Sequence, residues 1–227
     1  MCCTCNKKQY VIISSVLCAL VMAFVDGVLQ PSYFMKSVAK LTLFLLPALG
    51  YYMQFGAWED LKALFRLKKW ELVIALALGF SALIVITGGY FIIDRYFDLD
   101  AIILERTSQG GVSAENFAWV SIYIALVNSM LEEFFFRGYA FLNLKALTSR
   151  PFAYILSGVL FAVYHFGMLG VGATILVSLV AMGLLFVSGL ILNALNERSG
   201  SILTSWLLHM CANLAINAVG FYVFGMI

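Results

Sequence analysis

Both histidines of the chain lie in the middle of long apolar segments. His165 lies in one such segment and His209 in another, and a third carries the adjacent carboxylates Glu132 and Glu133. Ionisable side chains inside a bilayer are costly, and membrane proteins normally keep them for ion paths, proton relays or catalysis. A carboxylate and an imidazole can together hold and deprotonate water, as hydrolysis requires, or bind a divalent metal such as zinc. We therefore expect one buried site shared by three helices.

The spacing of the polar residues predicts which side chains share a helix face. Residues four apart are neighbours on a helix, so Glu133 can pair with Arg137, and His209 can present its imidazole beside the amide of Asn213. One arginine needs only one carboxylate. Glu132, which points about 100° away from its neighbour, is therefore expected to remain available. A buried Glu-Arg pair is often purely structural, so Glu133 and Arg137 are predicted to support the site.

The composition identifies the environment of these residues. Of the 227 residues, 63% are hydrophobic and 11% are charged, against roughly 25% charged in a soluble domain, and the mean hydropathy is +0.97. Apolar runs of about 20 residues are long enough to cross a bilayer. The fold class predicted is all-α, a polytopic transmembrane helical bundle. The net charge of +2 and the absence of a basic stripe give no indication of nucleic-acid binding.

The sequence predicts about seven membrane spans (seven or eight) that position the site. Their boundaries are defined to within about 2–4 residues. An amphipathic stretch with tryptophans at both ends, residues 58–70, predicts a short interfacial helix, and the polar residues 94–116 predict a solvent loop. We divide the chain into an N-terminal transmembrane region, residues 1–116, and a catalytic core, residues 117–227. The predicted spans are 10–29, 36–56, 71–93, 117–143, 152–170, 172–193 and 202–226.

The charges flanking the spans predict an orientation. Nine lysines and arginines fall on the side of the N-terminus and four on the other side, with Lys36 and Lys40 among the four, so the N-terminus is predicted to be cytoplasmic. At 1.5 Å per residue, His165 lies roughly 20 Å, Glu132 about 15 Å and His209 about 10 Å from the N-terminal side. We expect a multi-pass integral membrane protein, in the cell membrane if the source is bacterial, with a site that opens to the inner half of the bilayer.

Three motifs resemble those of the CPBP intramembrane proteases, which include type II CAAX prenyl endopeptidases and bacteriocin-processing relatives. The resemblance extends from Asn128 to Leu214, and the motifs lie in order on separate predicted helices. They are Glu132-Glu133-x-x-x-Arg137, Phe161-x-x-x-His165 and His209-x-x-x-Asn213.

The resemblance implies a role for each motif residue. Glu132 and His165 would activate water, His209 and Asn213 would form the oxyanion site, and Glu133 with Arg137 would support the motif or the substrate. The family has been treated as glutamate-dependent and as metal-dependent; a metal, if present, would be held by Glu132, His165 and His209, and zinc is the candidate. The implied activity is an intramembrane endopeptidase that acts on membrane-associated, prenylated or leader-bearing proteins or peptides.

Other functions remain open at this point. The chain has no His-Glu-x-x-His, Gly-x-Ser-Gly or Gly-x-Gly-Asp sequence of the other membrane protease classes. A non-catalytic bacteriocin-immunity or regulatory scaffold could keep the same motifs. A proton-coupled transporter could use the same groups as a relay, but it should show inverted repeats or paired broken helices, and the sequence shows neither.

Overall fold

The computed structural model describes residues 2–66, 69–169 and 175–227, and within these ranges it describes no side chain of residues 2, 3, 168 and 169. Throughout this part of the chain the regular elements are helices, and no strand occurs among them. The predicted all-α class is therefore confirmed.

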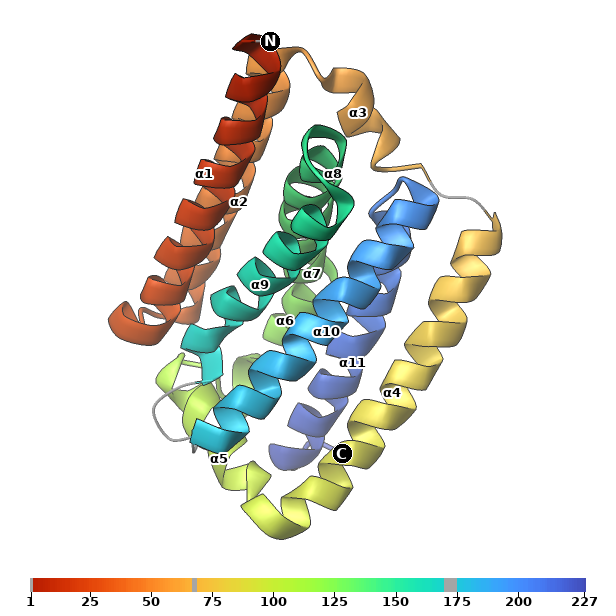
Figure 1. Cartoon of the computed structure of the whole chain (residues 1–227). Coiled ribbons are helices and arrows are strands. Elements are labelled where there is room, and N and C mark those ends of the chain that lie inside the picture. The colour runs from red at the N-terminus through yellow and green to blue at the C-terminus, as the bar shows by residue number, and fades with distance from the viewer. Residues whose placement is uncertain (1, 67–68, 170–174) are drawn as a thin grey trace.

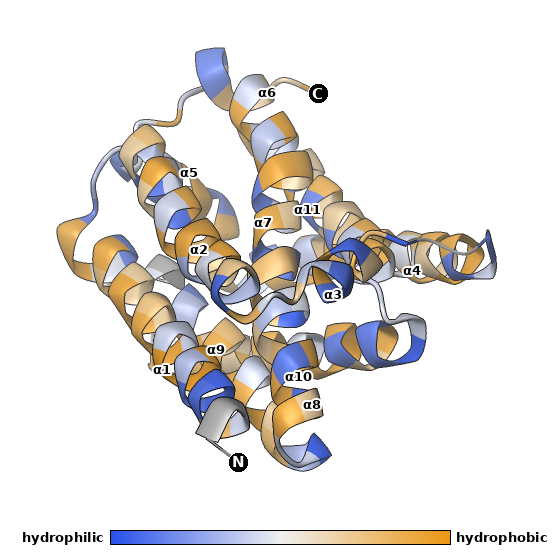
Figure 2. Cartoon of the chain, turned by 90° about the horizontal axis from the view of Figure 1, so that it is seen from above, coloured by the Kyte–Doolittle hydropathy of each residue, from blue (hydrophilic) through white to orange (hydrophobic). Residues whose placement is uncertain are grey.

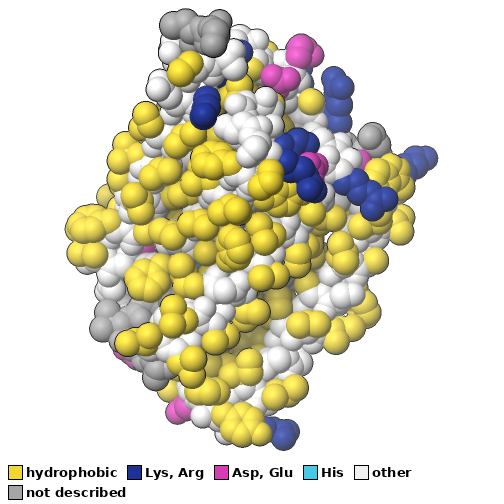
Figure 3. Space-filling view, viewed as in Figure 1, with side chains coloured by type: hydrophobic (Ala, Val, Ile, Leu, Met, Phe, Trp, Pro, Cys, Tyr) yellow, Lys and Arg dark blue, Asp and Glu magenta, His cyan; other side chains and the backbone are white. Residues whose placement is uncertain are grey.

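Six helical segments among the described residues are long and apolar enough to cross a membrane. Their outward faces are apolar: Val73, Phe80, Val85 and Ile92 of one helix are each roughly two-thirds exposed. Hydrophobic residues recur along all the long helices in the ribbon of Figure 2, and hydrophobic side chains cover much of the face in Figure 3. A surface of this kind is suited to lipid rather than water. The six segments are Thr4–Leu29, Tyr33–Phe55, Lys69–Phe97, Ala114–Leu147, Ile175–Ser199 and Leu203–Val223.

The N-terminal region begins with a helical hairpin. Helix α1 (Cys2–Phe24) continues into the π-helical turn η1 (Val25–Leu29), and the chain then reverses into α2 (Tyr33–Phe55). Ser32 caps α2, because its hydroxyl accepts the backbone N–H of Met35 at 3.5 Å. The interfacial helix predicted over residues 58–70 is only partly present: α3 covers Trp58–Ala63, and residues 67–68 lie outside the described residues.

The expected solvent loop over residues 94–116 is wrong, because most of this segment is helical. Helix α4 (Lys69–Phe97) is followed directly by α5 (Leu99–Gln109). The acids interpreted as loop residues cap α5: Asp94 accepts the backbone N–H of Leu99 at 2.7 Å, and Asp98 accepts that of Ala101 at 3.4 Å. Carboxylates at a helix start bind the backbone N–H groups that lack a partner within the helix.

The span that carries the two glutamates is one continuous helical run with two π-helical stretches. It covers the predicted span 117–143 and extends beyond it at both ends. The π-helical stretches lie directly before and after the short α-helical turn that ends at Glu132. Its parts are α6 (Ala114–Ile122), η2 (Tyr123–Asn128), α7 (Ser129–Glu132), η3 (Glu133–Leu142) and α8 (Asn143–Leu147).

Three helices complete the bundle: α9 (Arg150–Leu169), α10 (Ile175–Ser199) and α11 (Leu203–Val223). Helix α9 corresponds to the predicted span 152–170. Residues 170–174, which follow it, lie outside the described residues. The predicted start of the next span, at residue 172, falls among them. Helix α9 packs against both α1 and α10, and α4 packs mainly against α11. The helices that carry the motifs thus lie between two flanks: α1 and α2 form one flank, and α4 forms the other (Figure 1).

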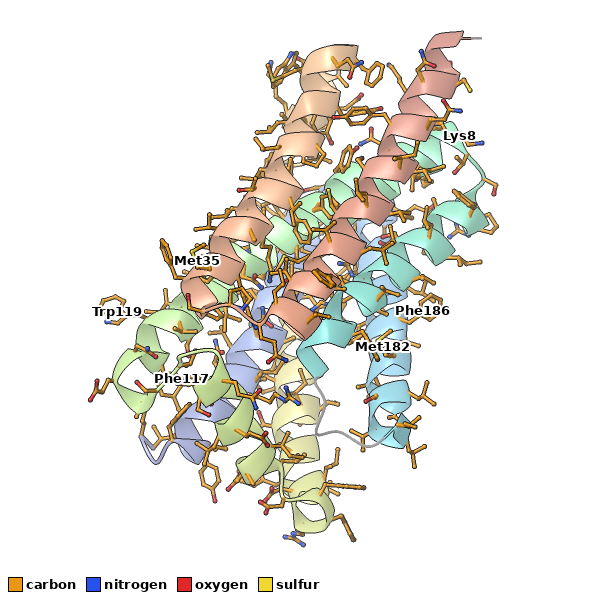
Figure 4. All side chains as sticks on the ribbon, turned by 90° about the vertical axis from the view of Figure 1, so that its left-hand side faces the viewer. Lys8, Met35, Phe117, Trp119, Met182 and Phe186 are labelled. Carbon is orange, nitrogen blue, oxygen red and sulfur yellow. The ribbon has the colours of Figure 1, made fainter. Side chains whose placement is uncertain are left out.

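The two ends of the bundle differ in charge and in the elements that close them. Helix α3 and the N-terminus lie at one end and α5 at the other (Figure 1). Lys8 lies toward the first end (Figure 4). Most of the Lys and Arg side chains on the face in Figure 3 gather at the α3 end. Trp119 points away from the bundle and is 76% exposed, as a lipid-facing residue would be.

Candidate active site

Glu132 lies at the centre of the bundle, at the end of α7, and its side chain is 2% exposed. Its Oε1 accepts hydrogen bonds from Asn128 at 2.7 Å and from Tyr164 at 2.9 Å. The ammonium of Lys40 lies 3.3 Å from the same oxygen. Asn128 lies one turn before Glu132 on the same helical run. The expectation of an available carboxylate is only half right, because one of its two oxygens is fully engaged.

The second oxygen of Glu132 faces both histidines. Oε2 is buried and has no hydrogen-bond partner among the described residues. His165 Nε2 lies 3.7 Å from it and His209 Nε2 lies 3.8 Å from it. These distances are too long for direct hydrogen bonds and suit a bridging water. The structure therefore brings together the three groups that the sequence placed on separate helices.

The other nitrogen of each imidazole is engaged, and this determines where the protons lie. His165 Nδ1 is 2.8 Å from the carbonyl oxygen of Phe161, and His209 Nδ1 is 2.9 Å from Oε1 of Glu133. Both partners only accept, so Nδ1 donates in each ring, and the Nε2 atom of a neutral ring presents its lone pair toward Glu132. The ring of Phe161 also packs edge-on against His165 with centroids 4.5 Å apart, as its position one turn earlier predicts.

Glu133 and Arg137 form a completely buried ion pair behind His209. Arg137 Nη1 lies 3.4 Å from Glu133 Oε1, and both side chains are 0% exposed. The guanidinium also stacks on Phe161, with its carbon 3.9 Å from the ring centroid. Glu133 thus links Arg137 to the ring of His209. The ring of His209 lies between the two neighbouring carboxylates, with one nitrogen toward each.

Asn213 lies one turn beyond His209, as predicted, and it is 9% exposed. One of its amide hydrogens is donated to the carbonyl oxygen of Ile124, in η2, at 3.2 Å. An amide has two N–H groups, so one remains for a ligand. Two further side chains of α11 bind carbonyl groups in and next to η2: Trp206 donates to Leu126 at 3.2 Å and Asn217 to Ser121 at 2.9 Å.

A cavity of about 820 Å³ opens onto this site. Its walls are largely apolar, and the lining residues include Leu78 and Val85 of α4 and Leu185 and Ile191 of α10. Its volume is within the usual range for a ligand pocket. Glu132, His165, His209 and Asn213 all line it, so the four residues predicted as catalytic share one accessible surface.

The cavity reaches the α5 end of the bundle, where Gln30, Arg106 and Gln109 line it. Of the described residues around α3, none lines the cavity. The expectation that the site opens toward the end carrying the N-terminus is therefore wrong. The depth of a residue along its helix does not show which neighbouring helices leave an opening.

The predicted metal ligands do not form a ready cation site. Within the described ranges no group of three His, Cys, Asp or Glu side chains is arranged to hold a metal ion. The ammonium of Lys40 also lies 3.3 Å from Glu132, where it would repel a divalent cation bound to that carboxylate. The charge of Lys40 thus opposes a divalent cation at Glu132, and zinc bound by Glu132, His165 and His209 stays a prediction from the resemblance.

Two residues that contact the site were missed from the sequence. Tyr164 carries no sequence signal of its own. Lys40 was counted among the charges flanking the spans, yet it is 7% exposed and lies inside the bundle. Its position five residues into the predicted span 36–56 was a usable signal, by the same reasoning that was applied to the histidines. Asp26 is likewise an ionisable residue inside a predicted span. It is buried, and its Oδ1 lies 3.6 Å from Nζ of Lys36.

The helical bundle and its buried carboxylate-imidazole centre define a polytopic membrane protein with the groups of a hydrolase. Residues 114–215 match the family model described as Rce1-like, type II CAAX prenyl endopeptidase Rce1-like. The match covers 102 of the 227 residues and confirms the resemblance to the CPBP proteases for this part of the chain. Searches of the curated proteins and of the solved structures gave no match. The general class of function supported by the family is an intramembrane protease.

Proposed function

We propose that the chain is an intramembrane endopeptidase in which Glu132 and His165 activate a water molecule. The observation that carries the proposal is the buried Oε2 of Glu132, which has no hydrogen-bond partner in the described part of the chain and which two imidazole nitrogens face at 3.7 and 3.8 Å. A water molecule between them would lie within hydrogen-bond reach of all three atoms. Catalytic groups must be held in this way before the substrate arrives, because misplacement is costly in rate.

The reaction that this geometry favours is direct hydrolysis. The water oxygen attacks the scissile carbonyl carbon and gives one proton to Glu132, while its other hydrogen bonds to Nε2 of His165. When the C–N bond breaks, the leaving amine takes the proton from Glu132. No covalent intermediate with the protein is needed, and the carboxylate is regenerated.

His209 and Asn213 are proposed to stabilise the oxyanion that forms in this step. For this role His209 donates through Nε2, while its Nδ1 donates to Oε1 of Glu133 at 2.9 Å and holds the ring in place. Asn213 contributes the amide hydrogen that Ile124 does not bind. Donors of this kind act only as charge develops, so they accelerate the chemical step more than they strengthen substrate binding.

The charge balance favours a mechanism without a bound metal. Glu132 is already balanced by Lys40 and Glu133 by Arg137. A divalent cation would add two positive charges in a setting of low dielectric constant, where uncompensated charge is expensive. We therefore propose that the carboxylate itself acts as the base.

We propose as substrates membrane-associated proteins or peptides with a hydrophobic segment. The apolar walls of the cavity support this class, because they can hold a hydrophobic chain beside Glu132. A prenylated carboxyl-terminal peptide and a leader-bearing peptide are the two particular substrates to test.

The test is the cleavage of a library of membrane peptides by the purified protein in detergent, read by mass spectrometry. The library contains prenylated and unprenylated versions of the same carboxyl-terminal sequences and leader-bearing peptides. The proposal predicts cleavage that persists in the presence of a chelator and disappears in Glu132→Gln. Loss of cleavage on chelation, with bound metal in the purified protein, would establish metal dependence instead. No cleavage of any peptide would favour the non-catalytic scaffold.

A further inference from the structure

Lys40 is a cation inside the second membrane span, and its side chain is 9% exposed. Its ammonium donates to Oδ1 of Asn128 at 2.6 Å and lies 3.3 Å from Oε1 of Glu132. It also lies over the ring of Tyr164, 5.0 Å from the centroid. A lysine is rarely buried in this way unless it is paired, and the carboxylate that pairs with it is the proposed catalytic base.

The contacts of Lys40 form a closed arrangement around one oxygen of Glu132. Asn128 accepts from Lys40 and donates to Oε1 of Glu132 at 2.7 Å, and Tyr164 donates to the same oxygen at 2.9 Å. Among the residues that the structure describes, three donate to Oε1 and none donates to Oε2. The three donors restrict rotation of the carboxylate and orient its free oxygen toward His165 and His209.

We infer that Lys40 is a positioning residue for Glu132, which holds the carboxylate charged and oriented so that Oε2 can take the proton of the attacking water. This inference rests on the proposed function. Lys40 belongs to α2, outside the residues 114–215 that match the Rce1-like family. The proposed active site is therefore completed by the N-terminal region of the chain.

The kinetic test compares three variants on a peptide that the wild-type protein cleaves. Lys40→Met removes the charge and the donor but keeps most of the length, and we expect kcat to fall about 100-fold while KM stays nearly unchanged. Lys40→Arg keeps a cation and should recover a large part of kcat. The matched control is Lys145→Met, which breaks a lysine-glutamate pair of similar length, 3.4 Å to Glu197, far from the site, and should leave kcat unchanged. Wild-type kcat in Lys40→Met would overturn the inference.

A stability measurement keeps the test decisive if Lys40→Met folds poorly. We expect Lys40→Met to lower the melting temperature in the presence of Glu132, because a buried carboxylate loses its cation. In the Glu132→Gln background the same substitution should cause little or no further loss, because the charge that needs Lys40 is gone. Equal losses in the two backgrounds would show that Lys40 acts independently of Glu132 and would contradict the inference.

Failure of this inference and failure of the proposed function give different results. If the wild-type protein cleaves, Glu132→Gln does not, and Lys40→Met cleaves at the wild-type rate, only the role of Lys40 is wrong. If Glu132→Gln cleaves as fast as the wild-type protein, the proposed function of Glu132 itself is wrong.

Discussion

The adjacent carboxylates Glu132 and Glu133 each have their own cation, and the two pairs differ in what the sequence could predict. Glu133 and Arg137 are four residues apart on one helix, so their pairing follows from helix geometry and is confirmed at 3.4 Å. Lys40 lies 92 positions from Glu132. Spacing along one helix gives no information on such a contact, because it depends on how α2 is rotated against α7 in the folded bundle.

The ion pair behind His209 predicts a specific pattern of stability. Arg137→Ala leaves Glu133 buried without its cation and also removes the stacking on Phe161, so it should cost about 3–5 kcal/mol. The double variant Glu133→Gln with Arg137→Gln leaves no unpaired charge and should be milder than Arg137→Ala alone. Thermal unfolding in detergent measures both. Equal destabilisation by the two variants would show that charge pairing does not dominate at this position.

The helices themselves were predictable, and their irregularities were not. Runs of about 20 apolar residues locate membrane helices reliably, and each predicted span overlaps a helix of the structure. The π-helical stretches η2 and η3 were missed, because an apolar pattern in lipid has no strong periodicity. Helix α5 was missed because its acidic capping residues resemble those of a loop. Stretches of π-helix are frequent at functional sites, and here they flank Glu132.

Hydrogen bonds from α11 should stabilise the irregular helix beside the site. Trp206 donates its indole N–H to the carbonyl of Leu126 and to the hydroxyl of Ser129. Trp206→Phe keeps most of the ring but leaves both acceptors without this donor, so we expect a loss of about 1 kcal/mol in unfolding free energy. Trp119→Phe is the control, since Trp119 points away from the bundle (Figure 4). Equal melting temperatures for the two variants would argue against this role of α11.

In the molecule as a whole, the end that carries most of the lysines and arginines is opposite the end that the cavity reaches. Lys40 was counted on the outer side but is buried, so the count of four flanking charges there falls to three, against nine on the side of the N-terminus. The asymmetry thus becomes stronger, and a cytoplasmic N-terminus remains our prediction. The cavity reaches the opposite, α5 end. This opening could not be predicted, because it depends on how helices that are far apart in the sequence pack against one another.

Labelling of single cysteines tests this orientation. The native cysteines are replaced by serine, and Glu59→Cys in α3 and Ser108→Cys in α5 are then introduced separately. With the N-terminus in the cytoplasm, a membrane-impermeant thiol reagent added to intact cells should label Ser108→Cys, and should label Glu59→Cys only after permeabilisation. The reverse pattern would place the α3 end outside and invert the proposed topology.

The proposal that Glu132 takes the proton of the attacking water is tested most directly by kcat for peptide-bond cleavage. It is measured for the wild-type protein and for Glu132→Gln on the same peptide in detergent. Glutamine keeps the size of the side chain but cannot accept the proton of the attacking water. We expect kcat to fall by about 10² to 10⁴-fold in a variant that still elutes as a single folded species. A Glu132→Gln protein that cleaves the peptide at the wild-type rate would contradict the proposal.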